Sequence, residues 1–256
     1  MTLPEQPLAP PPPHRPAIGW SIHALTASGV VVGLLGLIAV LDDHPKAALL
    51  WLVAAVVIDG VDGPMARGCD IKRCVPKLDG YILDVVVDYV TCVVVPVAFI
   101  HHFRLLPPSL SITLIATVLF VSALWMSRTD METDDNWFNG FPAEWNFVVP
   151  SLYLLGTSTW VNSVVVLFFC ALTMTNIKFV HPVRVRVNRT ITLSVTVVWM
   201  ATMTGLTIGY PDSNVWGRII LVAGPAYYMW LTVRRTFDDG FRVPERPAVA
   251  SESGGV

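Results

Sequence analysis

The most informative feature of this 256-residue sequence is how little charge it carries. Charged residues make up 14% of the chain, whereas hydrophobic residues make up 54% and the mean hydropathy is +0.59. A soluble globular domain carries about 25% charged residues, so much of this chain faces something other than water. The composition therefore excludes an ordinary soluble domain.

Two further scarcities exclude other classes of protein. The formal net charge is −2, which lacks the basic excess of nucleic-acid-binding proteins, so we expect no nucleic-acid partner. The four cysteines are too few and too scattered for a disulfide scaffold. They also lack the partner ligands that a closed, four-coordinate zinc site requires.

Long apolar runs are missing from both ends of the chain. Residues 1–16 are dominated by proline and lack the charged-then-apolar order of a signal peptide. Residues 238–256 are polar and rich in Pro, Gly and Ser. We predict that both ends are disordered and that residues 17–237 form a single membrane domain.

Between its ends the sequence consists of apolar segments separated by short polar loops. A transmembrane helix needs about 20 mainly apolar residues, and continuous rather than alternating hydrophobicity favours helices over a barrel. The fifth segment is the weakest, because it is short and contains Glu144, Asn146 and Pro150. The sequence therefore predicts an all-α integral membrane protein, a bundle of about eight transmembrane helices: Ile18–Leu41, Ala47–Ala66, Gly80–Ile100, Leu110–Met126, Ala143–Leu155, Trp160–Ile177, Ile191–Ile208 and Val215–Val233.

Basic residues orient the predicted bundle. If both termini are cytoplasmic, the outer loops hold only three of the 17 Lys and Arg residues, namely Lys46, Arg104 and Arg218. Short cytoplasmic loops carry the excess of Lys and Arg in membrane proteins. We therefore predict that both termini are cytoplasmic.

Two pairs of carboxylates interrupt the second and third apolar segments. Asp59 and Asp62 are three residues apart, and Asp84 and Asp88 are four apart, so each pair lies on one helix face. The short loop between these segments predicts antiparallel neighbours, which places the four carboxylates at one depth. Hard divalent cations, bound by carboxylate oxygens, would neutralise such a cluster. We predict a two-metal site for Mg²⁺ or Mn²⁺, which is typical of displacement at phosphorus.

The carboxylates have two other possible roles. A single Asp near a helix end often caps the helix, but two facing pairs are harder to explain in that way. A proton or ion transporter also uses intramembrane carboxylates, and it is the alternative from another class. A transporter would need acids along a path to the outer face, where the sequence offers only Asp42, Asp43 and Asp212, all in loops.

The carboxylates belong to a longer pattern that resembles the signature of the CDP-alcohol phosphotransferase family. All eight fixed positions of that signature are matched: Asp59-x2-Asp62-Gly63-x2-Ala66-Arg67, then Gly80-x3-Asp84-x3-Asp88. The twelve-residue spacer from Gly68 to Asp79 is longer than in most members. That spacer, with the segments 23–29, 134–146 and 179–184, resembles the bacterial phosphatidylcholine synthase subgroup. Glu144 departs from the subgroup, because a small or apolar residue is expected at its position.

The resemblance implies a reaction in which CDP-diacylglycerol and choline give phosphatidylcholine and CMP. It also implies a homodimer in the bacterial inner membrane, with the active site near the cytoplasmic face. The same chemistry on another alcohol, such as an inositol or glycerol phosphate, is the alternative within the family. By analogy, Asp59, Asp62 and Asp84 bind metal, and Asp88 binds the second metal or acts as the general base. Six further residues would border the nucleotide and diphosphate: Gly63, Ala66, Arg67, Gly80, Thr26 and His23.

The loop after the fourth segment carries the residues expected to recognise choline. A quaternary ammonium group is bound by aromatic faces and a nearby anion, and the loop offers both: Asp134, Asp135, Trp137, Phe138, Phe141, Glu144 and Trp145. Interfacial Trp and Phe also anchor helices at the headgroup level, so composition leaves both interpretations open.

A basic run follows the sixth segment. It is predicted to hold the phosphate of the anionic lipid through Lys178, Arg184 and Arg186, the alternative being a solvated cytoplasmic loop. His181 lies in the same run and has no metal partner nearby, so it is interpreted as structural.

Overall fold

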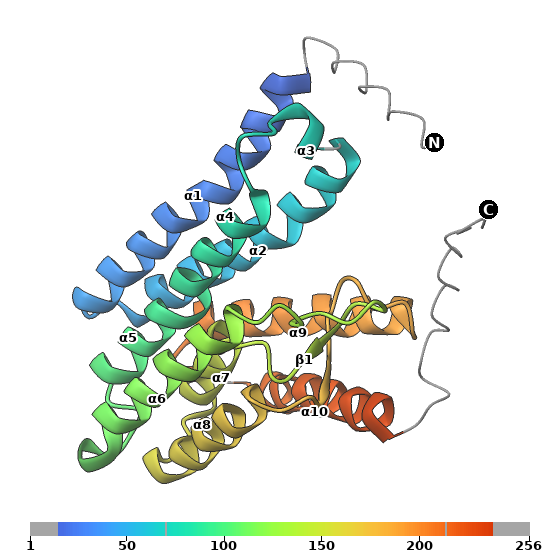
Figure 1. Cartoon of the computed structure of the whole chain (residues 1–256). Helices are drawn as coiled ribbons and strands as arrows, with labels where there is room; N and C mark the ends of the chain where they lie inside the picture. Colours follow the sequence, from blue (N-terminus) through green and yellow to red (C-terminus); the bar gives the residue numbers. More distant parts are fainter. Residues whose placement is uncertain (1–14, 70, 213, 238–256) are drawn as a thin grey trace, which may run out of the picture.

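The computed structural model describes residues 15–69, 71–212 and 214–237, and helices dominate this part of the chain (Figure 1). The predicted disordered ends, 1–16 and 238–256, lie outside the described residues except that the first helix already begins at Arg15. In chain order the elements are α1 Arg15–Leu41, α2 Pro45–Cys69, α3 Ile71–Cys74, α4 Gly80–Asp88, the π-helix η1 Tyr89–Val94, α5 Val95–His102, α6 Pro108–Met126, β1 Trp137–Asn139, α7 Trp145–Leu155, α8 Thr159–Thr173, β2 Lys178–Val180, α9 Arg189–Gly209 and α10 Val215–Phe237.

All eight predicted segments are helical, but they differ in their ability to cross a membrane. Among the described residues, five helical stretches are long and apolar enough to do so: Pro16–Leu41, Pro45–Cys69, Gly80–His102, Pro108–Met126 and Arg189–Gly209. The helices α7 and α8 are apolar but have only 11 and 15 residues, and α10 is long but not apolar enough. The prediction of an all-α integral membrane protein is confirmed at this level.

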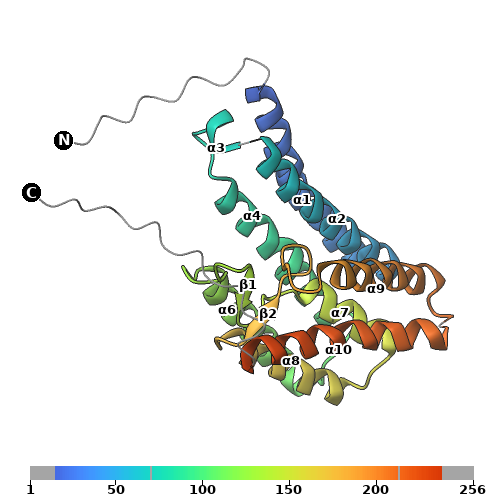
Figure 2. The ribbon, with the colours of Figure 1, turned by 90° about the vertical axis from the view of Figure 1, so that its right-hand side faces the viewer.

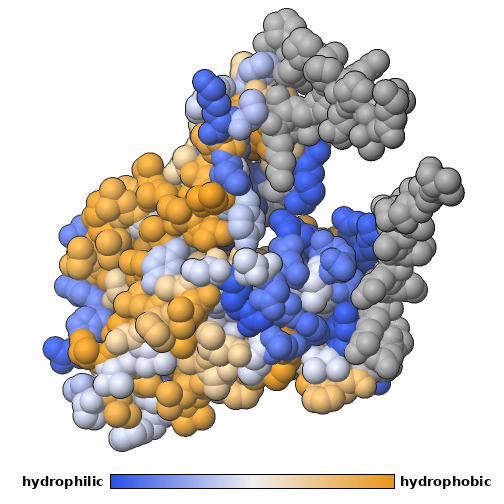
Figure 3. All heavy atoms as spheres, viewed as in Figure 1, coloured by the Kyte–Doolittle hydropathy of each residue, from blue (hydrophilic) through white to orange (hydrophobic). Residues whose placement is uncertain are grey.

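The surface of these helices suits lipid rather than water. Large apolar side chains point outward, and Val31, Phe120 and Val197 are 58%, 66% and 66% exposed. Figure 3 shows such residues covering one flank of the molecule, whereas hydrophilic residues gather in a hollow on the face turned to the viewer. This division separates a lipid-facing surface from a polar opening.

The long helices form two groups that meet near this hollow. The helices α1 and α2 lie side by side, with α4 along them, and α9 and α10 run across at a steep angle (Figures 1 and 2). Buried apolar side chains from α2, α5, α6, α7 and α9 form one continuous core, with Phe99 and Trp145 fully buried. This core does not include the polar C-terminal end of α2 or the start of α4, which line a pocket instead.

The third apolar stretch is not a uniform α-helix. It runs from Gly80 to His102 and changes to a π-helix over Tyr89–Val94, directly after Asp88. Proline at position 96 has no N–H and its ring clashes with the carbonyl four residues earlier, which disfavours regular α-helix there. Single π-turns inside α-helices are frequent at functional sites, and this one begins one residue after a predicted site carboxylate.

A small two-stranded sheet, whose strands are separated in the chain by α7 and α8, was not predicted from the sequence. Strand β1 pairs antiparallel with β2, and Phe138 lies opposite Phe179. The guanidinium of Arg235 on α10 donates to Asp135 at 2.9 Å and lies over the ring of Trp137, 5.8 Å from its centre. These contacts fix the loop before α7 against the last helix.

An irregular segment then enters the core between β1 and α7. Phe141 and Ala143 are 5% and 0% exposed although they belong to no helix or strand. Gly140 has a φ of +88°, and a Cβ at this position would lie 2.3 Å from the carbonyl oxygen of Thr173, so only glycine fits. Irregular backbone is tolerated inside a membrane protein where protein buries it, and this segment ends at Glu144, the residue before α7.

Candidate active site

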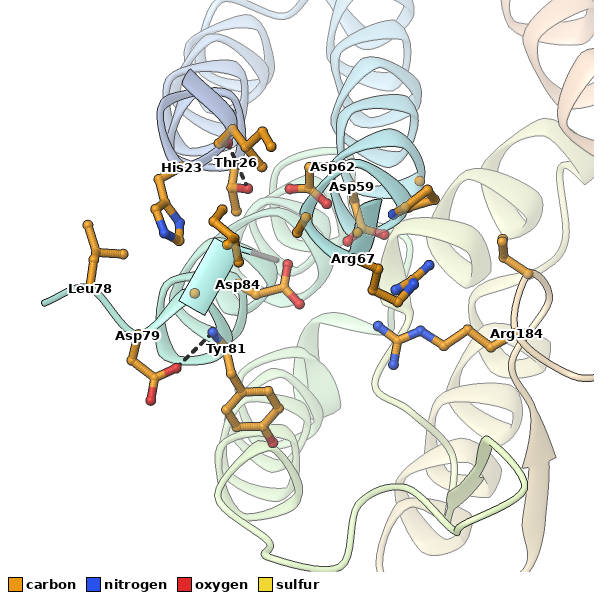
Figure 4. Close-up of a pocket in the computed structure, with 18 of the residues that line it drawn as sticks. His23, Thr26, Asp59, Asp62, Arg67, Leu78, Asp79, Tyr81, Asp84 and Arg184 are labelled. Atoms are coloured by element: carbon orange, nitrogen blue, oxygen red, sulfur yellow. Dashed lines mark hydrogen bonds between the residues drawn. The ribbon is translucent and has the colours of Figure 1, made fainter. Parts of the chain in front are cut away.

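The predicted carboxylates converge where α2 and α4 run side by side. Carboxylate oxygens of Asp59, Asp84 and Asp88, the acidic cluster, lie within 4.8 Å of one another. Asp62 is one turn further along α2 and is 5% exposed, and Figure 4 shows Asp59, Asp62 and Asp84 turned toward a common space. The helical spacing in the sequence therefore gives the expected convergence.

The acidic cluster fits a divalent cation. Three carboxylates at this separation repel one another strongly in a partly buried site. In addition, Oδ2 of Asp62 is buried and has no hydrogen-bond partner among the described residues. Carboxylate oxygens are the ligands that Mg²⁺ and Mn²⁺ prefer. Bound divalent cations would therefore offset the repulsion among the carboxylates and could coordinate the unpaired oxygen of Asp62.

A pocket of about 800 Å³, the large pocket, opens beside Asp59, Asp62 and Asp84 (Figure 4). All six residues predicted to border the nucleotide and diphosphate line it: Gly63, Ala66, Arg67, Gly80, Thr26 and His23. Nε2 of His23 is buried without a partner in the described structure. The arginines Arg67 and Arg184 extend into the same space, which gives the large pocket both carboxylates for metal and guanidinium groups for phosphate.

The twelve-residue spacer forms one wall of the large pocket. Ile71 of α3 and the turn from Pro76 to Asp79 line it. Asp79 caps α4, because its carboxylate accepts hydrogen bonds from the backbone N–H groups of Tyr81 at 2.9 Å and Ile82 at 3.4 Å. The cap fixes the start of α4, and so helps to set the position of Asp84 one turn later.

A second cavity of about 140 Å³, the small pocket, adjoins the acidic cluster and is lined by Asp59, Asp84 and Asp88. Asp59 and Asp84 line both pockets, whereas Asp88 lines only the small one. Phe138, Glu144 and other residues of the 130–147 segment complete its wall. The acidic cluster thus borders two spaces of different size, and Asp88 lines only the smaller one.

No family model matches the sequence, but curated relatives do. A phosphatidylcholine synthase of Pseudomonas aeruginosa is 38% identical over 229 residues, which is 90% of this chain and 96% of the relative. A phosphatidylcholine synthase of Brucella melitensis is 34% identical and covers 86% of this chain and 80% of its own. One of Mesorhizobium japonicum is 37% identical over 72% of this chain and 69% of its own. This chain belongs to the phosphatidylcholine synthase family. The resemblance seen in the carboxylate motif is thereby confirmed.

The structure divides the candidate choline residues into two sets. Phe138 and Glu144 line the small pocket. Trp137, Phe141 and Trp145 are at most 5% exposed and belong to the apolar core, where the indole N–H of Trp145 donates to Ser122 Oγ at 3.0 Å. Neither Asp134 nor Asp135 lines the large or the small pocket. Asp134 is exposed, and Asp135 forms an ion pair with Arg235. Composition could not separate these sets, because core and pocket aromatics have the same residue types.

The predicted lipid-phosphate residues are divided in the same way. Arg184 lines both pockets, and its Nη1 donates to both oxygens of Glu132 at 2.7 and 2.9 Å. Lys178 donates to Asn139 within the small sheet, and Arg186 is exposed. The structure therefore does not bring these three cations together at one phosphate.

His181 is a site residue that the sequence interpretation placed among structural residues. It lines both pockets, and its ring stacks on Phe138 with the centroids 5.0 Å apart. Burial, together with the positive charges of Arg184 and Arg67, lowers the pKa of His181 to about 3. The imidazole is therefore neutral at physiological pH. Glu132, Asn146 and Tyr81 also line the small pocket, although they are not among the seven residues predicted to bind choline.

Proposed function

We propose that this protein is a membrane phosphotransferase that condenses CDP-diacylglycerol with choline to give phosphatidylcholine and CMP. Membership of the phosphatidylcholine synthase family supports the choice of substrates. The observation that carries the reaction type is the acidic cluster, whose carboxylate oxygens lie within 4.8 Å at the junction of two pockets. One pocket has room for a nucleotide and diphosphate, and the other has room only for a small alcohol.

In this proposal the donor binds in the large pocket. Arg67 and Arg184 would contact phosphate oxygens, and Gly80 would let the nucleotide approach α4 next to His23. Asp59, Asp62 and Asp84 would hold two divalent cations, with Asp88 completing the second site. Such ions would neutralise the diphosphate and stabilise the departing CMP. Through these ions, Asp59, Asp62 and Asp84 would position the diphosphate beside Asp88.

The acceptor would react from the small pocket, on the side of Asp88. The hydroxyl oxygen of choline forms a bond with the lipid-side phosphorus while the bond from that phosphorus to the CMP oxygen breaks. The hydroxyl proton passes to the carboxylate of Asp88, which acts as the general base. Because Asp88 lines only the small pocket, it is better placed for this proton than Asp59 or Asp84.

The finer topology belongs to the same proposal. We place both termini and the active site on the cytoplasmic side of a bacterial inner membrane, with α7, α8 and α10 completing eight crossings. The distribution of Lys and Arg supports this orientation. A homodimer stays a prediction from the family resemblance.

The test is the release of CMP by purified protein from CDP-diacylglycerol in mixed micelles. We expect release to require choline and either Mn²⁺ or Mg²⁺, and a chelator to abolish it. CMP release with an inositol or glycerol phosphate in place of choline would refute the choice of acceptor. Absence of release with every alcohol would refute the phosphotransferase and favour the carboxylate-based transporter.

A further inference from the structure

The small pocket is lined by more acidic side chains than the three of the acidic cluster, which would bind metal. Of the described residues that line it, five are carboxylates and one is an arginine. Glu132 already occupies the guanidinium of Arg184 through two contacts of 2.7 and 2.9 Å. The metal site would neutralise the acidic cluster. Glu144 remains, a carboxylate that neither of these partners compensates.

Glu144 has no structural task that explains its charge. It occupies the residue before α7, where a carboxylate commonly accepts hydrogen bonds from the first backbone N–H groups, yet its side chain makes no such bond. Within the described part of the chain, no side chain forms an ion pair or a hydrogen bond with its carboxylate. An isolated carboxylate charge in a partly buried site is costly, so the empty pocket favours the neutral carboxyl group, and a bound cation would stabilise the carboxylate.

A second polar group in the same pocket also lacks a partner. Asn146 is 4% exposed and lines the small pocket, and its Oδ1 has no hydrogen-bond partner among the described residues. Buried side-chain oxygens are normally paired. The amide oxygen carries a partial negative charge, so it is a second group in this pocket that a hydrogen-bond donor or a positively charged ligand would satisfy.

The aromatic wall of the pocket suits a cation without N–H groups. Phe138 is held by stacking on His181 and by edge-on contact with Trp125, whose ring centroid is 5.7 Å away. His181 is neutral at physiological pH, so it does not repel a cation. The cavity of about 140 Å³ is well below the roughly 300 Å³ at which pockets for drug-sized ligands begin, which restricts the occupant to a small molecule.

We infer that the small pocket binds the cationic head of the acceptor alcohol between the ring of Phe138 and the carboxylate of Glu144. The inference rests on the proposed function, because it names the groups that select the acceptor of that reaction. Glu144 supplies charge attraction, and Phe138 supplies a face for a quaternary ammonium group. Asn146 adds its amide oxygen to the same site. The acceptor hydroxyl is then held on the side of Asp88.

The test compares choline with 3,3-dimethylbutan-1-ol, which has the same shape but carries no charge, and with ethanolamine. Steady-state CMP release is measured at saturating CDP-diacylglycerol and Mn²⁺. For Glu144→Gln we expect KM for choline to rise on the order of tenfold or more, with a smaller change in kcat, and KM for the neutral alcohol to stay constant. Glu144→Asp, which keeps the charge, should retain part of the preference for choline.

A second variant tests the aromatic face, and a third serves as the control. Phe138→Leu should lower the preference for choline over ethanolamine, because the quaternary group loses its aromatic face while the carboxylate remains. Asp130→Asn is the matched control, since Asp130 belongs to the same loop, is exposed and pairs with Arg128 at 2.8 Å. It should leave all three KM values unchanged.

The outcomes distinguish this inference from the proposed function. If Glu144→Gln keeps the wild-type preference for choline, or raises KM for choline and the neutral alcohol equally, Glu144 does not recognise the cation and the inference is refuted while the reaction stands. If the wild type uses a different cationic alcohol instead of choline, the assigned acceptor is wrong and the inference is supported. If it uses only anionic or neutral alcohols, both are refuted.

Discussion

At the residue scale, substitution of Asp88 tests whether the acceptor and the donor bind in different pockets. We expect Asp88→Asn to lower kcat by roughly 10²–10⁴-fold, because an amide cannot accept the hydroxyl proton. Affinity for CDP-diacylglycerol should change less than kcat, since Asp59, Asp62 and Asp84 remain to hold metal at the large pocket, which Asp88 does not line. CMP release and equilibrium binding of the donor measure the two effects separately.

The control for this variant makes the same chemical change at a distance. Asp42→Asn alters an exposed carboxylate at the far end of α1 and should leave both measurements at the wild-type value. Turnover of Asp88→Asn above about one tenth of the wild-type rate would remove Asp88 as the general base.

Gly80 provides a second test at this scale, because it leaves space for a neighbour. A Cβ at position 80 would lie 3.0 Å from Cε1 of His23, so Gly80→Ala requires the imidazole of His23, which also lines the large pocket, to shift. We expect KM for CDP-diacylglycerol to rise on the order of tenfold, which corresponds to about 1.4 kcal/mol. Gly68→Ala is the matched control, because a Cβ there meets nothing within 4 Å. Equal KM values for the two variants would contradict the assignment of the donor to this pocket.

At the scale of elements, the helices and the acidic cluster could be predicted from the sequence because both depend on local periodicity. Spacings of three and four residues place carboxylates on one helix face wherever the helix lies. The π-helix over Tyr89–Val94 could not be predicted in this way. It depends on how the chain accommodates proline at position 96 within a packed core, and many helices accommodate proline by bending instead.

The loop 134–146, which carries the predicted choline-binding residues, could be assigned from the sequence only in part. Its residue types are shared by choline sites, membrane-interface anchors and protein cores, so composition predicts all three. Only the path of the chain decides which occurs, and Gly140 turns that path inward. Trp145 and Phe141 then enter the core, while Phe138 stays at the pocket.

The contact between α10 and the small sheet gives a prediction at this scale. The guanidinium of Arg235 and the carboxylate of Asp135 are 8% and 9% exposed and 2.9 Å apart. Arg235→Ala leaves Asp135 buried without its partner, which costs roughly 3–5 kcal/mol in the free energy of unfolding. Thermal unfolding in detergent should show the loss. Asp135→Asn in the Arg235→Ala background should recover part of it, and failure to recover any would show that the two residues are not coupled.

At the scale of the whole molecule, the sequence predicts the number of helices better than the number of crossings. The helix α7 has 11 residues, and at 1.5 Å per residue it spans about half of a hydrocarbon core of roughly 30 Å. The irregular segment 140–144 precedes it inside the protein. Hydropathy counts apolar residues along the chain and does not reveal that irregular backbone precedes a helix of this length.

The turn between α7 and α8 decides between eight crossings and a re-entrant pair of helices. Ser158 is exposed in this turn, and if both helices cross, a cysteine there faces the outer side. We expect Ser158→Cys in a Cys69→Ser, Cys92→Ser background to react with a membrane-impermeant maleimide in spheroplasts, because the remaining Cys74 and Cys170 are buried. Asp130→Cys, on the predicted cytoplasmic loop, should react only after lysis. Labelling of both positions only after lysis would show that α7 and α8 return to the cytoplasmic side, which would leave six crossings and keep both termini on that side.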